Sequence, residues 1–139
     1  MRTVLFFAGL LLPFLVSSQC TLDIVIEYSR PPAPEAMVHL VLCDNMNSFE
    51  SEEHSYVVNT GAASPVTRIQ IPDLKPGTYA IKCYIDLNKN GKLDTGWNNT
   101  PTEPYGFSLN AARLSGIPTF DMAAFTVHEG VNVHRLRMR

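Results

Sequence analysis

The stretch YAIKCYIDLNKNGKLD, residues 79 to 94, joins a strand pattern directly to a polar loop pattern. Apolar residues recur at every second position of its first half, so Tyr79, Ile81, Cys83 and Ile85 are predicted to face inward from one β-strand. Its second half begins Asp-x-Asn-x-Asn-Gly, which is the start of a calcium-binding loop. Such a loop usually follows a helix. Here it follows a strand, so the stretch predicts a β domain with a structured polar loop.

Five further stretches have strand character and are separated by turn signals. They are CTLDIVIEY (20–28), MVHLVLCD (37–44), VTRIQIPDL (66–74), AAFTV (123–127) and VNVHRLRM (131–138). Residues 45–64 are polar and predict a loop with one helical turn, and the sequence has no long amphipathic helix. We therefore predict an all-β fold, a small antiparallel β-sandwich in which the long segment 86–118 forms one ordered loop.

The first 20 residues, MRTVLFFAGLLLPFLVSSQC, have the layout of a secretory signal peptide, with one positive charge, an apolar run and small residues before the cleavage point. The run is shorter than the roughly 20 apolar residues of a membrane span and is broken by Pro13. Cleavage after Ser18 divides the chain into an N-terminal signal helix, residues 1–18, and a single mature domain, residues 19–139, without a transmembrane span. We expect the mature protein to be secreted or periplasmic.

The cysteines leave two questions open. The alternative to a secreted or periplasmic protein is a lipoprotein anchored through Cys20. A lipoprotein signal normally has a small residue just before its cysteine, and Gln19 is not small. Export permits disulfides, but the chain has three cysteines, and the sequence does not select a pair among Cys20, Cys43 and Cys83. A buried thiol is the expected state of each one.

Charge argues against a nucleic-acid partner. The 139-residue chain carries 11 basic and 13 acidic residues, and removal of Arg2 with the signal peptide leaves 10 against 13, a net charge of −3. No basic patch occurs in the mature sequence. The sequence does not identify the partner, and among the remaining classes we expect a polymer, a glycan or an envelope protein.

The loop pattern supplies oxygen ligands at regular spacing. Asp86, Asn88 and Asn90 occupy every second position, which lets three side-chain oxygens surround one point. The glycine that follows permits a sharp turn, which brings the carbonyl of Lys92 inward, and Asp94 supplies the next oxygen. Calcium prefers six to eight oxygen ligands of these kinds, so Ca2+ is the expected ion.

The closing ligand of the loop is the missing part. The twelfth position is Trp97, which has no oxygen, and the nearest acid downstream is Glu103 between two prolines. We expect the chain to return so that Glu103 completes the metal site. The alternative is a metal-free turn, because Asn90-Gly91 is by itself a strong hairpin signal.

Aromatic residues follow the loop. Trp97, Tyr105 and Phe107 are candidate ligand contacts, since an aromatic platform can stack on a sugar or another flat ligand. The competing interpretation is a small apolar core that pins the long segment to the sandwich. Trp97 lies among polar residues and is the best candidate for exposure.

Three ordered blocks resemble a known family. DLNKNGKLD, PTEPYGFS and GIPTFDMAAFTV are similar to the bacterial exported family known as domain of unknown function 2141, over most of the mature chain. The resemblance implies a small β-sandwich and a signal peptide, and no established activity. LKPGTYAIKCYID also resembles the Pro-Gly-x-Tyr strand of prealbumin-like (transthyretin-like) domains, an analogy of fold alone.

These observations favour an exported, non-catalytic β-sandwich module with a calcium-stabilised loop and a binding or structural role at the cell envelope. One alternative is a metal-dependent enzyme that uses the acidic loop. Another is a passive envelope protein with a metal-free turn. Catalysis is disfavoured because the four histidines are scattered and no nucleophile accompanies them.

Overall fold

A computed structural model of the chain describes residues 19–51, 53, 56–63, 65–112 and 116–138. The expected signal peptide, residues 1–18, lies outside the described residues. No helix in the described part of the chain combines the length and the apolar character that crossing a membrane requires.

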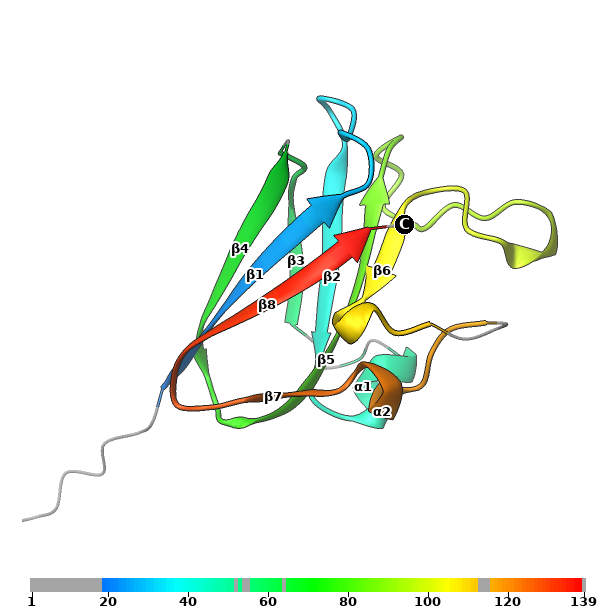
Figure 1. Ribbon diagram of the computed structural model, residues 1–139. Coiled ribbons are helices and arrows are strands. Elements are labelled where there is room, and N and C mark those ends of the chain that lie inside the picture. Colours follow the sequence, from blue (N-terminus) through cyan, green and yellow to red (C-terminus); the bar gives the residue numbers. More distant parts are fainter. Residues whose placement is uncertain (1–18, 52, 54–55, 64, 113–115, 139) are drawn as a thin grey trace, which may run out of the picture.

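Two sheets pack face to face, which confirms the predicted all-β sandwich (Figure 1). One sheet has the order β4 (Val66–Leu74), β1 (Cys20–Tyr28), β8 (Gly130–Met138), and the other has the order β3 (Tyr56–Gly61), β2 (Met37–Cys43), β5 (Gly77–Asp86), β6 (Tyr105–Phe107). The short β7 (Phe125–Val127) also pairs with β5. The short helices are α1 (Met46–Ser51), η1 (Trp97–Asn99), η2 (Ser108–Asn110) and α2 (Phe120–Ala123).

The main core lies between the sheets and follows the alternation of the sequence. Leu22, Ile24 and Ile26 on β1 are buried, as expected for one face of a strand. The four β5 residues predicted to face inward are buried as well. Burial of such side chains at about 25 cal/mol per Å2 of apolar surface is the main force that holds the sheets together.

Three features of the strand pairing were not predicted from the sequence. Residues 45–64 contain β3 as well as the helical turn, because β3 pairs with β2 along its whole length. The pairing of β1 with β8 is parallel, whereas the other pairings are antiparallel. The last two strands are not partners, since β7 pairs with β5 and β8 lies beside β1.

A second, smaller core covers the outer face of the β2–β5 sheet. Phe49 of α1 contacts Phe107 and Phe120, with ring centroids 6.3 and 6.0 Å apart. Ser108 is buried between the layers, where its Oγ accepts a hydrogen bond from the Ile81 N–H at 2.8 Å and donates one to a carbonyl of α2. These contacts attach the second half of the long segment to the sandwich without any ion.

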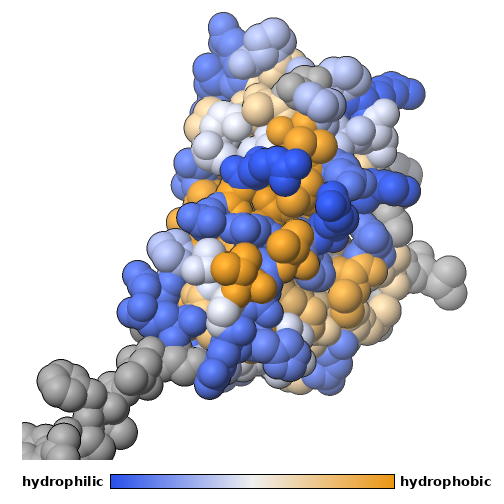
Figure 2. All heavy atoms as spheres, turned by 60° about the vertical axis from the view of Figure 1, so that its left-hand side comes forward, coloured by the Kyte–Doolittle hydropathy of each residue, from blue (hydrophilic) through white to orange (hydrophobic). Residues whose placement is uncertain are grey.

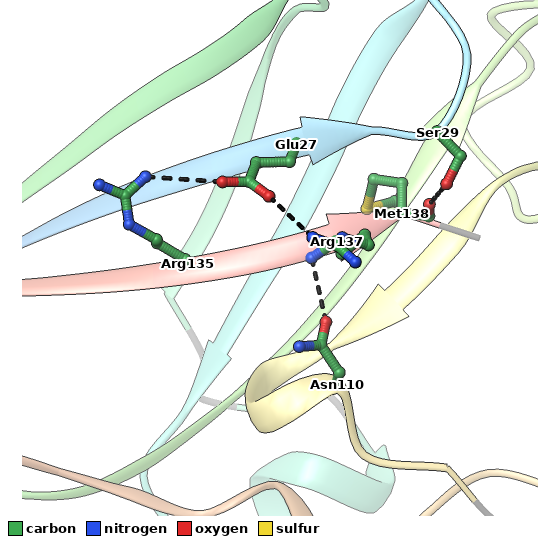
Figure 3. A network of polar contacts seen from close by, with 6 residues as sticks. All are labelled: Glu27, Ser29, Asn110, Arg135, Arg137 and Met138. Atoms are coloured by element: carbon green, nitrogen blue, oxygen red, sulfur yellow. Dashed lines mark hydrogen bonds and ion pairs between the residues drawn. The ribbon is translucent and has the colours of Figure 1, made fainter.

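Polar contacts fasten the C-terminal end of β8 (Figure 3). Glu27 lies beside Arg135 and Arg137 at 3.5 and 3.6 Å, and the Arg137 N–H donates to the side chain of Asn110 at 3.2 Å. The Ser29 hydroxyl donates to the main-chain carbonyl of the last residue of β8. The exposed ion pairs link β1 to β8 and contribute less than about 1 kcal/mol each, and the hydrogen bond to Asn110 holds η2 against β8.

All three cysteines lie among the described residues, and none is in a disulfide. Each is buried, which agrees with the expected buried thiol. Burial also raises the pKa of the Cys83 thiol far above its ordinary value.

On the side of the molecule shown in Figure 2, hydrophobic residues reach the surface in several patches bordered by hydrophilic ones.

Candidate functional site

The polar loop starts where β5 ends and returns alongside it. After the turn at residues 86–94, Thr102 donates its N–H to the Asp94 carbonyl at 2.9 Å, and Gly96 donates to the Thr100 carbonyl at 2.8 Å. These bonds close a hairpin that projects from the sandwich beside the end of β5 (Figure 1). The Ile85 N–H then donates to the Pro104 carbonyl at 2.8 Å, which holds the returning chain against the end of the strand.

This return places Glu103 at the base of the loop. The Glu103 side chain is only 6% exposed, and its two carboxylate oxygens accept hydrogen bonds from the Leu87 N–H at 2.7 Å and the Asp94 N–H at 3.0 Å. One carboxylate therefore joins the two ends of the turn. The chain therefore returns to the loop, as we expected, and Glu103 lies at its base. The role of Glu103 as a metal ligand stays a prediction.

Asp86 organises the turn from the other side. It is 5% exposed, and its two oxygens accept hydrogen bonds from the Asn90 N–H at 3.2 Å and the Gly91 N–H at 2.8 Å. Gly91 has a φ of 75°, in the left-handed region that a residue with a side chain rarely adopts. The glycine of the motif is therefore required by the backbone of this turn.

The remaining predicted ligands lie on the solvent side of the loop. Asp94 accepts side-chain amide hydrogen bonds from Asn88 at 2.6 Å and from Asn90 at 2.7 Å. Asn90 also accepts the N–H of Lys92 at 2.8 Å and thus connects Asp86 to Asp94. The loop brings these five residues and Glu103 into one hydrogen-bonded unit.

Among the residues that the structure describes, no side chain forms an ion pair with the carboxylates of this unit, which are those of Asp86, Asp94 and Glu103. Of the two lysines in the loop, Lys89 lies 3.3 Å from Glu35 instead, and Lys92 is exposed. Three carboxylates, two of them buried, therefore share a short loop without an ion pair to a described residue, and like charges held this way repel each other.

A metal ion on this loop would need more ligands than the three carboxylates. Within the described ranges, no three Asp, Glu, His or Cys side chains are close enough together to surround an ion. An ion would need the amide oxygens of Asn88 and Asn90 and the Lys92 carbonyl in addition to the carboxylates. Each carboxylate oxygen accepts one hydrogen bond here and retains a second lone pair.

The candidate aromatic contacts do not form one platform. Trp97 is 90% exposed at the tip of the hairpin, as the sequence favoured. Tyr105 and Phe107 lie on β6 and contact each other edge to face at 6.0 Å. Phe107 belongs to the second core and Tyr105 is half-buried, so Trp97 is the candidate contact that the fold leaves in solvent.

A cleft beside Glu103 was not expected from the sequence. It has a volume of about 740 Å3 and lies between the β1–β2 connection and the returning chain. Its lining includes Tyr28, Arg30, Pro31, Pro104 and Tyr105. The proline-rich stretches RPPAP and PTEP meet here, but nothing in the sequence indicates that the two are neighbours in space.

His39 and His134 each pack against an aromatic side chain. His39 Nδ1 lies 2.5 Å from the Asn59 side-chain oxygen, and its ring contacts Tyr84. His134 stacks on Phe125 with centroids 4.1 Å apart, and its burial lowers its pKa.

Comparison with known proteins gives one match. A family model described as "Uncharacterized protein conserved in bacteria (DUF2141)" matches residues 29–134. Neither the curated proteins nor the solved structures contain a match to the chain. The matched region includes the polar loop, the returning segment, the whole β3-β2-β5-β6 sheet and β4, whereas β1 and the end of β8 lie outside it.

Proposed function

The chain belongs to this uncharacterised bacterial family, DUF2141, and we propose that it is an exported, non-catalytic β-sandwich module whose loop 86–103 binds calcium. The bound ion stabilises the loop and the hairpin that carries Trp97. The module has a binding or structural role at the cell envelope.

One observation carries the calcium proposal. Asp86 and Glu103 are buried at the two ends of one loop with Asp94 between them, and no positive side chain in the described part of the chain pairs with these three residues. Buried charges in proteins are as a rule paired or bound to a metal. A divalent cation on the loop would balance this charge, and calcium accepts the mixture of carboxylate, amide and carbonyl oxygens that the loop offers.

The expected strength of binding indicates a structural ion. Extracellular calcium modules have dissociation constants of roughly 0.1 to 1 mM. At about 1 mM calcium and the tight end of that range, binding stabilises the folded state by about 1.4 kcal/mol. This amount is sufficient to order a loop and far below the roughly 5.5 kcal/mol that inverts a two-state equilibrium from 1:99 to 99:1.

The position of Cys20 supports a mature chain without a lipid anchor. Cys20 is the first residue of β1, and its side chain is fully buried in the main core. A lipid attached to this sulfur would have to remove the side chain from a close-packed interior. We therefore propose a secreted or periplasmic protein.

The experiment is thermal unfolding of the mature protein in calcium, in magnesium and in chelator. We expect calcium to raise the midpoint by about 5 °C, the equivalent of about 1.4 kcal/mol for a domain of this size. Magnesium should have little effect, because it retains its water and requires a small octahedral site. The double variant Asp86→Asn with Asp94→Asn should lose the response to calcium, and an unchanged midpoint in the wild type would contradict the proposal.

A metal-free turn is the second candidate, and a specific observation favours it. All six carboxylate oxygens of Asp86, Asp94 and Glu103 already accept hydrogen bonds from the loop itself. In that case the loop is stable in chelator and indifferent to calcium. The same thermal experiment separates the two candidates.

The contact surface of the module is proposed to be the hairpin with Trp97. An exposed tryptophan at the end of a held turn offers a large apolar area at a low entropy cost. Trp97→Ala should leave stability unchanged and weaken retention on bacterial glycans or envelope polymers, measured by co-sedimentation. Equal retention of the two proteins would contradict this role of Trp97.

A further inference from the structure

The edge strands of the two sheets differ in how they are protected against pairing with another chain. A free edge presents unpaired N–H and C=O groups, and natural proteins protect such edges with charges, prolines, bulges or covering segments. The order β4-β1-β8 places β4 and β8 at the edges of one sheet, and the order β3-β2-β5-β6 places β3 and β6 at the edges of the other.

Three of these edges carry recognisable protection. The strand β4 contains Arg68 and Pro72, and its pairing with β1 shifts register near Asp73, which has a φ of 58°. The strand β8 has two arginines, and η2 covers it through Asn110. The strand β6 is only three residues long.

The strand β3 carries none of these devices among the described residues. Its sequence is YVVNTG, with no charge and no proline. Its pairing with β2 runs without a register shift from Met37↔Gly61 to Leu42↔Tyr56. Tyr56 is 49% exposed and Val57 is 51% exposed, so apolar side chains accompany the free backbone groups.

We propose that β3 is a self-association edge, on which a second copy of this chain adds its own β3 antiparallel about a two-fold axis. A two-fold interface brings the same residues of both copies together, so a charge on the strand would face a like charge. The absence of Asp, Glu, Lys, Arg and His on β3 removes that penalty, whereas Arg68 would bring like charges together in a pair of β4 strands. This inference is independent of calcium.

The faces of the strand limit the register. Val58 packs on the main core, and Val57 and Asn59 alternate with it on the outer face of the sheet. For the outer faces of two copies to continue as one sheet, residues of the same face must stand opposite each other. We assign a register centred on Val58, with Val57 opposite Asn59 and Tyr56 opposite Thr60.

Six residues of strand give a small interface. At about 3.4 Å per residue the strand is about 20 Å long, so the buried area falls below the 1,200–2,000 Å2 of stable complexes. We therefore expect a weak dimer, with a dissociation constant on the order of 0.1 mM. Such a dimer forms where the protein is concentrated, for example when it is held at a surface.

Two double variants test the strand and its register together. In Val57→Lys with Asn59→Lys, each lysine faces a lysine of the other copy. In Val57→Lys with Asn59→Glu, each lysine faces a glutamate. Both variants carry Lys at position 57 and lose the contact of Asn59 with His39, so they differ only in the charged residue at position 59.

The measurement is sedimentation velocity in chelator from about 10 µM to about 1 mM protein, a range that spans the expected dissociation constant. We expect the wild type to dimerise, the lysine pair to weaken the dimer at least about tenfold, and the lysine–glutamate pair to retain it. The variant Val133→Lys, on the outer face of β8 at 61% exposure, is the control and should dimerise like the wild type. A wild type that stays monomeric, or equal loss in both double variants, would overturn the proposal.

Discussion

Replacement of Glu103 tests how the polar loop is held. In Glu103→Ala the N–H groups of Leu87 and Asp94, at 2.7 and 3.0 Å from the carboxylate, lose their acceptors. A buried donor without an acceptor costs about 1–3 kcal/mol. Since Leu87 is 45% exposed and Asp94 is partly exposed, water compensates part of this cost, and we expect a total loss of about 1–3 kcal/mol in the free energy of unfolding. Glu103→Gln retains one acceptor oxygen and should lose about half as much.

The assay is urea unfolding followed by circular dichroism, first in chelator and then in calcium. The control is Glu35→Ala, because Glu35 is highly exposed and makes one surface ion pair with Lys89, so its loss should be under about 1 kcal/mol. If Glu103→Ala costs no more than this control in chelator, its hydrogen bonds do not hold the loop. If both Glu103 variants still gain stability from calcium as the wild type does, Glu103 is not the closing ligand.

Three further outcomes are expected. Gly106→Ala should destabilise the domain by about 2 kcal/mol in urea unfolding, because its Cβ would lie 2.9 Å from the Arg137 carbonyl oxygen and would push β6 away from β8. Because burial lowers the pKa of His134 below its unfolded value, near 6.5, stability should fall as pH decreases below about 6.5. His134→Gln should flatten that dependence, and an equally steep curve would contradict it. Finally, Cys83 should resist iodoacetamide in the native protein at pH 8, because it is buried and its pKa is raised, and fast alkylation would contradict its burial.

The sequence predicted the strands wherever alternation was strong. VTRIQIPDL became β4 at the expected bounds, and CTLDIVIEY became β1. It missed β3, because YVVNTG follows an acidic stretch and only its pairing with β2 makes it a strand. The parallel partnership of β1 and β8 was equally out of reach, since it joins residues 20–28 to residues 130–138, which are far apart in the sequence.

The contacts of the polar loop were also predicted only in part from the sequence. Side chains close in sequence, such as Asp86 with Asn90 and Gly91, form the turn that the motif indicated. Alternation and composition cannot show that Ser108 joins β5 to α2 or that two proline-rich stretches line one cleft. Those contacts depend on the return of the chain after the hairpin.

The sequence by itself determined the β class, the inward face of each strongly alternating strand and the residues of the polar loop, because each depends on short-range periodicity or spacing. The tertiary structure alone decided which strands are neighbours and which edge is left unprotected. It also decided that Glu103 lies beneath the loop while Trp97 extends into solvent. These features depend on long-range packing, in which a residue acquires its role from partners that the linear order does not place beside it.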